Sequence, residues 1–314
     1  MSNPNASSND RWPDITHSSW AETAAALHLY TQVLGKVRLT VTPWTNHSWH
    51  VPLYVNARGL TTSLMSCDGV DFEMRMDFIK HDVEIETTTG AMRRVDLGPG
   101  AVGNFYGSVM AQLRQLGVGV KIQTMPSEIE GATPFERDNE HRPYDRDAVT
   151  RFWHALVGMQ RVFTEFRSGF RGKCSPVHFF WGSFDLAVTR FSGRTAPPHP
   201  GGVPNFPDWV AREAYSHEVS SAGFWPGGGG NDAIFYSYAY PKPDGFEQTR
   251  VRPDDAKWSE ELGEFVLPYA AVREADDPEA ALMAFLQSTY DAAADAAGWD
   301  RDALECNLPE DARG

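Results

Sequence analysis

Cysteine is scarce in this sequence, and basic residues are outnumbered by acidic ones. Its three cysteines (Cys67, Cys174 and Cys306) stand far apart with no CxxC pair, which excludes a disulfide framework and a zinc knuckle. Against 42 Asp and Glu there are 28 Lys and Arg, and the resulting net charge of −14 repels a phosphate backbone. We therefore expect reduced thiols and no general binding of nucleic acid.

Long apolar runs and familiar catalytic motifs are also missing. No stretch approaches the roughly 20 apolar residues of a membrane helix, and the start, MSNPNASSNDRWPD, lacks the parts of a signal peptide. No GxSxG motif occurs, so no hydrolase nucleophile is indicated, and a Rossmann nucleotide site is not expected either. The sequence predicts a cytoplasmic protein without a membrane partner, and no motif names a cofactor.

What the chain does have is length and aromatic side chains. Its 314 residues can bury a large core without disulfides or structural metals. Aromatic residues make up 12% of the sequence, and such side chains both fill a core and line pockets.

The first half of the chain predicts a helix, a series of strands and a second helix. Ser19 and Glu22 form a capping-box pattern, which predicts a helix from there to Gly35. Residues 102–117 place apolar side chains at helical spacing and end on a glycine, which predicts a second helix. Between the helices, antiparallel strands are predicted at residues 36–42, 49–56, 72–78, 83–85 and 92–97.

The second half repeats this order. A long amphipathic helix begins near Asp145, and Asp277 followed by a proline marks the start of a last helix. Between them, strands are predicted at residues 177–181, 184–191, 217–225 and 234–240.

The predicted fold is α+β, with two similar halves packed as a pseudo-two-fold unit. Each half reads helix, antiparallel strand meander, helix, and each contains a Gly-Lys pair (residues 35–36 and 172–173). We therefore treat an internal duplication and a chance match as the two open alternatives. The expected parts are a tail (1–14), an N-terminal half (15–125), a polar linker (126–145), a C-terminal half (146–300) and a C-terminal tail (301–314).

Chemically useful side chains concentrate in residues 173–230, around predicted strands and glycine-rich turns. A second aromatic and histidine cluster lies in residues 44–58. One of its faces is expected to line, together with the first segment, a groove between the two halves. The candidate catalytic residues are His178, Asp185 and His217. The candidate ligand-binding residues are Trp181, Arg190, Glu218, Trp225, His50 and Tyr54.

A metal site and ordinary packing compete as explanations for the histidines. His178, His199 and His217 are weak candidates for metal ligands, because imidazole suits zinc, iron and manganese. Their spacing argues against a metal, since no pair stands two or four residues apart. His217 and Glu218, as neighbours on a strand, should face opposite ways. Hydrogen-bonded histidines in the core and on a loop are the favoured alternative.

Asp185 and Arg190 stand out as charges in an apolar strand. Five residues apart, they should project to opposite faces of the sheet. Each would need a partner if buried, so they belong either to a structural ion-pair network, the favoured reading, or to a ligand site. The glycine run at 227–230 lacks the Lys-Ser/Thr and the helix of a P-loop and predicts a turn.

The chain also resembles a known group of proteins in three long strings. These are LHLYTQVLGKVRLTVTPWTNHSWHVPLYVNARGLTTS, SPVHFFWGSFDLAVTRFSGRTAPPHPGG and EAYSHEVSSAGFWPGGGG. Through them the chain is similar to an uncharacterised bacterial family known only as a domain of unknown function, over nearly its full length. The resemblance implies no activity, cofactor or catalytic residue.

Two functional hypotheses follow. The leading one is a cytosolic protein that binds a small organic ligand, with or without catalysis, in an aromatic and His-lined groove. The alternative is a noncatalytic interaction or structural protein whose exposed aromatics and acidic linker meet a partner. A concave pocket holding several of the candidate groups would favour the first hypothesis.

Overall fold

The first half of the chain folds into two helices and an antiparallel sheet. The computed structural model describes residues 11–306. Strands β1, β2, β4, β5 and β6 follow one another across the sheet. Strand β3 also pairs with β4, at residues 70–72, whereas β2 pairs with residues 75–77 of β4. The elements are α2 (Ala21–Val41), β1 (Tyr54–Asn56), β2 (Gly59–Thr61), β3 (Met65–Cys67), β4 (Val70–Asp77), β5 (Asp82–Thr87), β6 (Met92–Asp96) and α3 (Val102–Gln115).

The second half also places an antiparallel sheet between two long helices in sequence. The strand order is β13-β14-β12-β11-β10-β9, a meander except at its far edge. The main elements are α4 (Arg146–Ser168), β9 (His178–Phe180), β10 (Asp185–Thr195), β11 (His217–Trp225), β12 (Ile234–Tyr240), β13 (Lys257–Ser259), β14 (Glu264–Pro268) and α7 (Pro278–Ala296). Mixed helices and antiparallel sheets confirm the predicted α+β class.

Short elements complete the chain. The strands β7 and β8 pair with each other and form a third, two-stranded sheet. These elements are η1 (His17–Ser19), η2 (Asn46–Ser48), β7 (Gly100–Ala101), η3 (Phe135–Arg137), β8 (His141–Arg142), α5 (Asp208–Ala214), η4 (Phe246–Gln248), α6 (Tyr269–Glu274) and α8 (Arg301–Leu304).

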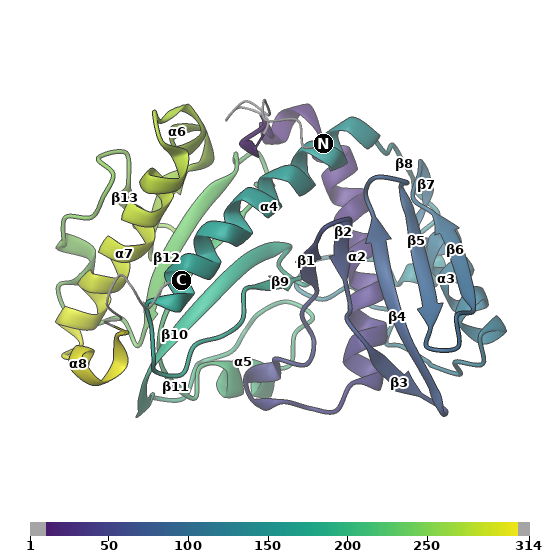
Figure 1. Ribbon diagram of the computed structural model, residues 1–314, viewed down its shortest axis with the longest axis horizontal. Coiled ribbons are helices and arrows are strands. Elements are labelled where there is room, and N and C mark those ends of the chain that lie inside the picture. The colour runs from purple at the N-terminus through teal and green to yellow at the C-terminus, as the bar shows by residue number, and fades with distance from the viewer. Residues whose placement is uncertain (1–10, 307–314) are drawn as a thin grey trace, which may run out of the picture.

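The two larger sheets meet edge to edge. Leu53, just before β1, exchanges two backbone hydrogen bonds of 2.9 Å with Phe179 of β9. Both side chains are fully buried, and the apolar core runs through both halves. We call this line of contact the seam. In Figure 1, β1 and β9 lie side by side at the middle of the molecule.

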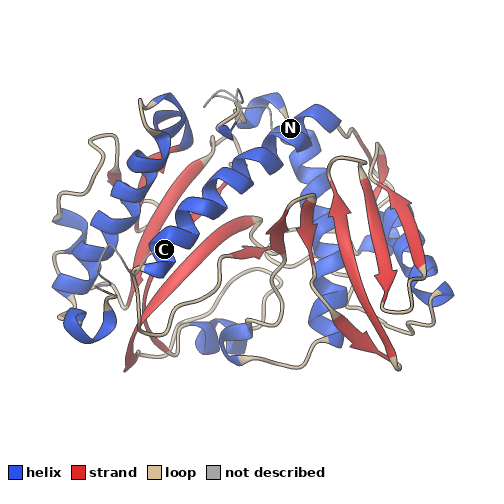
Figure 2. Ribbon diagram, viewed as in Figure 1, coloured by secondary structure: helices blue, strands red, loops and turns tan. Residues whose placement is uncertain are grey.

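Helices cover opposite sides of the two sheets in the view of Figure 2. Helices α4 and α7 lie in front of the second sheet, whereas α2 and α3 lie behind the first. On β10, Leu186 and Val188 are buried on the side of α4 and α7, where Arg190 contacts both helices. Asp185 and Thr189 therefore project from the other side, which we call the open face of the second sheet.

The first helix is longer than predicted. It begins after Trp20 rather than at a Ser19 cap, and the Ser19 hydroxyl instead donates to the Thr16 carbonyl at 2.7 Å. It runs through Gly35 to Val41, so the strand predicted at residues 36–42 is wrong. Gly35 lies inside the helix. The position holds a glycine because the indole of Trp181 packs directly against it, and a Cβ there would come within 2.3 Å of the indole ring.

Other local predictions are confirmed. Strand β4 buries Phe72, Met74 and Met76 on one face, as the alternation required. Helix α7 begins at Pro278, and its first turn is capped by the Asp277 carboxylate, which accepts from the amide of Ala280 at 3.0 Å.

Residues 126–145, the predicted polar linker, are held against the rest of the fold. The amide of Ser127 donates to the side chain of Gln32 on α2 at 2.7 Å, and Phe135 is fully buried. Glu128 donates its backbone amide to Pro204, in the second half, at 3.0 Å. Among the helices of residues 11–306, none combines the length and apolar character needed to cross a membrane.

Candidate functional site

Asp185 is the most deeply buried carboxyl group on the open face of the second sheet. Its side chain is 6% exposed and accepts hydrogen bonds from the Ser183 hydroxyl and the Tyr236 hydroxyl. Burial raises the pKa of this carboxyl, and the two hydrogen bonds oppose that shift. Tyr236 reaches Asp185 by lying across Gly223, where a Cβ would come within 2.3 Å of the phenol. A residue with a side chain at position 223 would collide with the phenol, so the contact between Tyr236 and Asp185 requires a glycine there.

Tyrosines line the same face beside Asp185. Tyr236 and Tyr238 alternate on β12, and their rings stack at 6.2 Å with an interplanar angle of 15°. The hydroxyl of Tyr238 bonds to that of Tyr215 at 2.8 Å. Burial raises the pKa of all three phenols, so each remains a neutral hydroxyl at neutral pH. All three side chains nevertheless keep partial exposure.

Glu128 reaches this face from the 126–145 segment. Its carboxylate lies over Gly182, where any side chain would collide with it, and its backbone is left-handed at φ 61°. Burial, with a contribution from Asp185, raises the pKa of Glu128 to about 7. Lys36 of α2 is buried beside it, over the Trp181 ring at 5.5 Å, and donates to the Ser127 hydroxyl at 3.0 Å. Burial lowers the Lys36 pKa to about 8.

Glu264 brings a third carboxyl group to the set. It begins β14 and is half-buried, and burial together with the charge of Asp185 raises its pKa to about 7. In the described part of the chain, no Lys, Arg or His nitrogen lies within 4.0 Å of the carboxyl oxygens of Glu128, Asp185 or Glu264. We call the group formed by Glu128, Asp185, Glu264, Tyr215, Tyr236 and Tyr238 the carboxyl–tyrosine cluster.

A second group gathers at the seam, which we call the seam cluster: Arg38, Tyr54 and His178. The Tyr54 ring lies 5.5 Å from the Arg38 guanidinium and 5.7 Å from the His178 ring. Arg38 is 7% exposed and donates to the Thr62 carbonyl. His178 is 1% exposed, and burial, with the charge of Arg38, lowers its pKa to about 3. The predicted ligand residue His50 lies near this cluster, and burial and Arg38 lower its pKa as well.

His217 belongs to a third group, around His47. The two rings are 5.9 Å apart. The ammonium of Lys173 contacts His47 Nε2 at 2.5 Å, and His47 Nδ1 lies 3.0 Å from the backbone carbonyl of Glu213. His47 and the next residue, Ser48, are both left-handed, at φ 56° and 58°. The candidate catalytic residues His178, Asp185 and His217 are thus distributed over three neighbouring groups.

Arg190 lies on the side of the helices, away from Asp185, as alternation predicted. Its guanidinium lies 3.5 Å from the ring centroid of Phe166 and 4.3 Å from that of Tyr290, and it donates to the Phe166 carbonyl. Burial lowers its pKa to about 10. Neither Arg190 nor Asp185 forms an ion pair with another described residue, so the favoured ion-pair network is wrong. Aromatic faces and a carbonyl stabilise the buried cation instead.

The remaining predicted residues lie in different surroundings. Glu218 accepts from Ser192 at 2.9 Å and pairs with Arg194 at 2.6 Å, on the side opposite His217. His199 stacks on the Tyr215 ring at 4.6 Å. Trp181 donates its indole N–H to the Val51 carbonyl at 2.9 Å, under α2, and Trp225 is half-buried at the end of β11.

The predicted metal ligands do not converge. Among described residues, the group with metal-like spacing contains no histidine and consists of Asp77, Asp82 and Glu84. Basic side chains already neutralise it: Arg58 contacts Asp77, and Lys80 and Arg94 contact Glu84 at 2.7 and 2.9 Å. These hydrogen bonds help to lower the Glu84 pKa to about 2. The arrangement is an ion-pair network on the first sheet.

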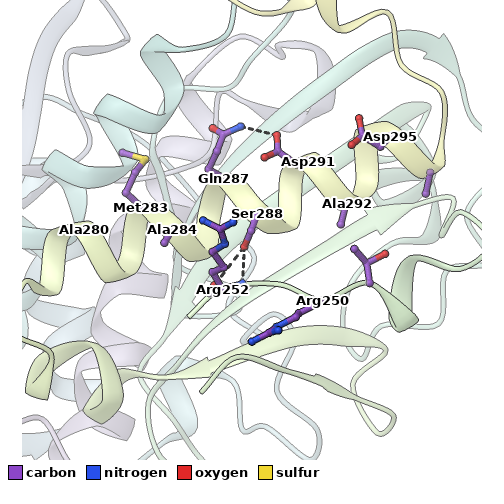
Figure 3. Close-up of a pocket in the computed structure, with 12 residues that line it drawn as sticks. Arg250, Arg252, Ala280, Met283, Ala284, Gln287, Ser288, Asp291, Ala292 and Asp295 are labelled. Atoms are coloured by element: carbon purple, nitrogen blue, oxygen red, sulfur yellow. Dashed lines mark hydrogen bonds between the residues drawn. The ribbon is translucent and has the colours of Figure 1, made fainter. Parts of the chain in front are cut away.

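A groove of about 860 Å³ opens along the outer side of α7 (Figure 3). Met283 and several alanines line its floor, and Arg250 and Arg252 lie on the opposite side. The Arg252 amide donates to the Ser288 hydroxyl at 2.9 Å. None of the predicted site residues lines this groove. Its charged side chains are exposed, apart from the half-buried Asp291, so the groove holds no fully buried charged group.

Comparison with known proteins places the chain in one family. The model of a family of unknown function, DUF5996, matches residues 12–306. The chain belongs to this family. No curated protein and no solved structure matches the chain. Membership confirms the resemblance found in the sequence, and it assigns no role to any residue.

Several members of the carboxyl–tyrosine cluster were missed in the sequence. Glu128 lay in a stretch interpreted as a linker, and Glu264 in a strand that was not predicted. Tyr236 and Tyr238 did carry a signal, since tyrosines alternate with Phe235, Ser237 and Ala239 along β12 and so share one face. Lys36 was hidden by the mistaken end of the first helix.

Proposed function

We propose that the protein binds a small organic cation, such as a protonated amine, at the carboxyl–tyrosine cluster. The observation that carries the proposal is the set of three shielded carboxyl groups, Glu128, Asp185 and Glu264, with no basic nitrogen within 4.0 Å of any of them. Buried negative charge is stable only when it is paired, protonated or neutralised by a ligand. Lys36 offsets part of the charge of Glu128, and an amine would supply a cation to Asp185 and Glu264.

Partial exposure leaves several groups of the carboxyl–tyrosine cluster within reach of a ligand. Glu128, Glu264 and Tyr238 keep accessible surface although burial dominates their raised pKa values. The phenol rings suit the same ligand class, because the face of an aromatic ring attracts a cation.

The proposal is tested by titrating n-butylamine, with n-butanol as the neutral ligand of similar shape, by calorimetry. The amine should bind saturably at about pH 8, where Glu128 and Glu264 are ionised and the amine is protonated. Glu128→Gln should weaken binding at least about tenfold, since it removes the negative charge and keeps the shape of the side chain.

Glu130→Gln provides the matched control, because Glu130 is an exposed carboxylate two residues from Glu128. This variant should bind butylamine as the wild type does. Equal binding of butylamine and butanol, or an unchanged affinity in Glu128→Gln, would refute the cation site. Far-ultraviolet circular dichroism of each variant verifies that it is folded.

We also propose that the two halves arose by internal duplication. In support, α2 precedes one antiparallel sheet and α4 the other, each sheet is followed by a long helix, and the first strands of the halves meet at the seam. Superposition of α2 through α3 onto α4 through α7 tests this idea, and failure to align the strands in order would refute it. Cytoplasmic location and bacterial origin stay predictions from the sequence.

A further inference from the structure

His178 is a buried side chain without hydrogen-bond partners. It is 1% exposed, and neither ring nitrogen has a partner among the described residues. A neutral imidazole carries one donor and one acceptor, and leaving both unmade in the interior is unfavourable. The surrounding groups are aromatic: Trp49 at 5.8 Å, Tyr54 at 5.7 Å and Phe180 at 5.3 Å between ring centroids. None of these rings satisfies the imidazole.

Arg38, in the same seam cluster, lacks a counter-ion. No carboxylate of the described chain lies within 4.0 Å of its guanidinium, although the side chain is 7% exposed. One nitrogen donates to the Thr62 carbonyl, and Nε is buried without a partner. A buried guanidinium ordinarily pairs with a carboxylate or phosphate, because its planar donors match two oxygens.

The register of the second sheet places His178 next to the proposed amine site. In the pairing of β9 with β10, His178 stands opposite Ala187 and Asp185 stands opposite Phe180. His178 and Asp185 therefore share the open face as diagonal neighbours, with Cα atoms about 7–8 Å apart. The unpartnered His178 imidazole, with Arg38 near it in the seam cluster, thus adjoins the carboxyl–tyrosine cluster.

We propose that the ligand is a small zwitterion whose carboxylate is held by Arg38, His178 and Tyr54 while its amine meets the carboxyl–tyrosine cluster. This inference rests on the proposed amine site. The carboxylate would accept from the Arg38 guanidinium, from an imidazole N–H of His178 and from the Tyr54 hydroxyl. An ω-amino acid, with its charges separated by a short methylene chain, is the class of compound that fits.

A carboxylate is favoured over a phosphate because of the charge available at the seam. Arg38 supplies the guanidinium of the seam cluster, the charge of Arg167 acts more weakly on His178, and the imidazole of His178 is neutral at physiological pH. One fixed positive charge balances a carboxylate, whereas a phosphate dianion would keep an unbalanced charge in an apolar setting.

The test compares matched ligands by calorimetry on the full chain. n-Butylamine carries the amine alone, butyrate the carboxylate alone, and 4-aminobutyrate, 5-aminopentanoate and 6-aminohexanoate carry both at increasing separation. At least one amino acid should bind ten or more times as tightly as butylamine, by about 1.4 kcal/mol. Butyrate should bind weakly, and one chain length should be preferred.

His178→Phe and Arg38→Met identify the site of the carboxylate. Both should lose the advantage of the amino acid over butylamine while still binding butylamine. His178→Phe keeps the ring and removes both unpartnered nitrogens, so it should fold at least as stably as the wild type. Should a variant not fold, the ¹⁵N shifts of the His178 ring in the wild type should move with the amino acid and stay unchanged with butylamine.

The two proposals fail in different ways. If butylamine binds but no amino acid binds more tightly, or if His178→Phe retains the full advantage, the carboxylate site is refuted and the amine site survives. If butylamine does not bind, the amine site itself is refuted. If only butyrate binds, with loss in Arg38→Met, the seam cluster is an independent anion site and the zwitterion is refuted.

Discussion

Replacing Glu128 by Gln should change how the stability of the protein depends on pH. Glu128 has a folded-state pKa of about 7, raised from an ordinary value of 4.5 by burial and by Asp185. An acid with a raised folded pKa favours folding while it is protonated. Its contribution is fully present below the unfolded pKa and is lost as pH rises through the folded pKa.

The size of the effect follows from the two pKa values. Over most of the interval from about pH 5.5 to 7.5, the folded state still holds a proton on Glu128 that the unfolded state has already lost. The resulting fall in the free energy of unfolding, integrated over this interval, is about 2 kcal/mol. The free energy of unfolding of the wild type, minus that of Glu128→Gln, should therefore fall by about 2 kcal/mol over this interval. Glutamine cannot ionise and contributes no such change.

Urea unfolding of both proteins at several pH values measures this difference. The difference, rather than the wild-type curve, is the readout, because buried imidazoles act in the opposite direction and cancel in the subtraction. Their folded pKa values lie below the ordinary value, so their contribution is lost as pH falls through the unfolded pKa. These imidazoles belong to His28, His47, His50, His81, His178 and His199.

Glu130→Gln, on the exposed part of the same loop, should show a flat difference. A flat curve for Glu128→Gln as well, or one that rises with pH, would refute the shielded state of Glu128. The proposed amine site would then lose its main electrostatic support, since an open, solvated carboxylate has no need of a bound cation.

Further outcomes are expected elsewhere in the fold. Gly223→Ala should lower the free energy of unfolding by about 2–3 kcal/mol in urea titrations, because its Cβ would collide with Tyr236 and a backbone oxygen. Arg190→Ala should cost about 3–5 kcal/mol and Arg190→Met much less, since methionine fills the aromatic cage without a charge. Glu84→Gln should cost about 3 kcal/mol by leaving basic partners unpaired, and Mg²⁺ or Mn²⁺ should not shift the wild-type melting temperature. The affinity for butylamine should rise between about pH 6 and 8 as Glu128 ionises, which calorimetry across that range would show.

Local patterns in the sequence were sufficient wherever a single element decided the outcome. The cap at Asp277 and the alternation in β4 depend on residues close together in the chain, and both were predicted. Gly35 shows the limit of this approach. As an isolated glycine it resembles a helix end, and only Trp181, far along the chain, explains why the helix continues through it.

The candidate site was predicted in part for the same reason. Asp185 and His178 were recognised because polar groups are conspicuous in apolar strands, yet their partners come from other segments: Glu128 from a loop, Glu264 from a distant strand and Arg38 from a mispredicted helix. The strand register brings His178 beside Asp185, and through these two residues the seam cluster adjoins the carboxyl–tyrosine cluster. Each group alone would be an unfavourable burial of charge, whereas a ligand with complementary ends would stabilise both at once. That complementarity is why the amine site and the carboxylate site should be tested with the same ligands.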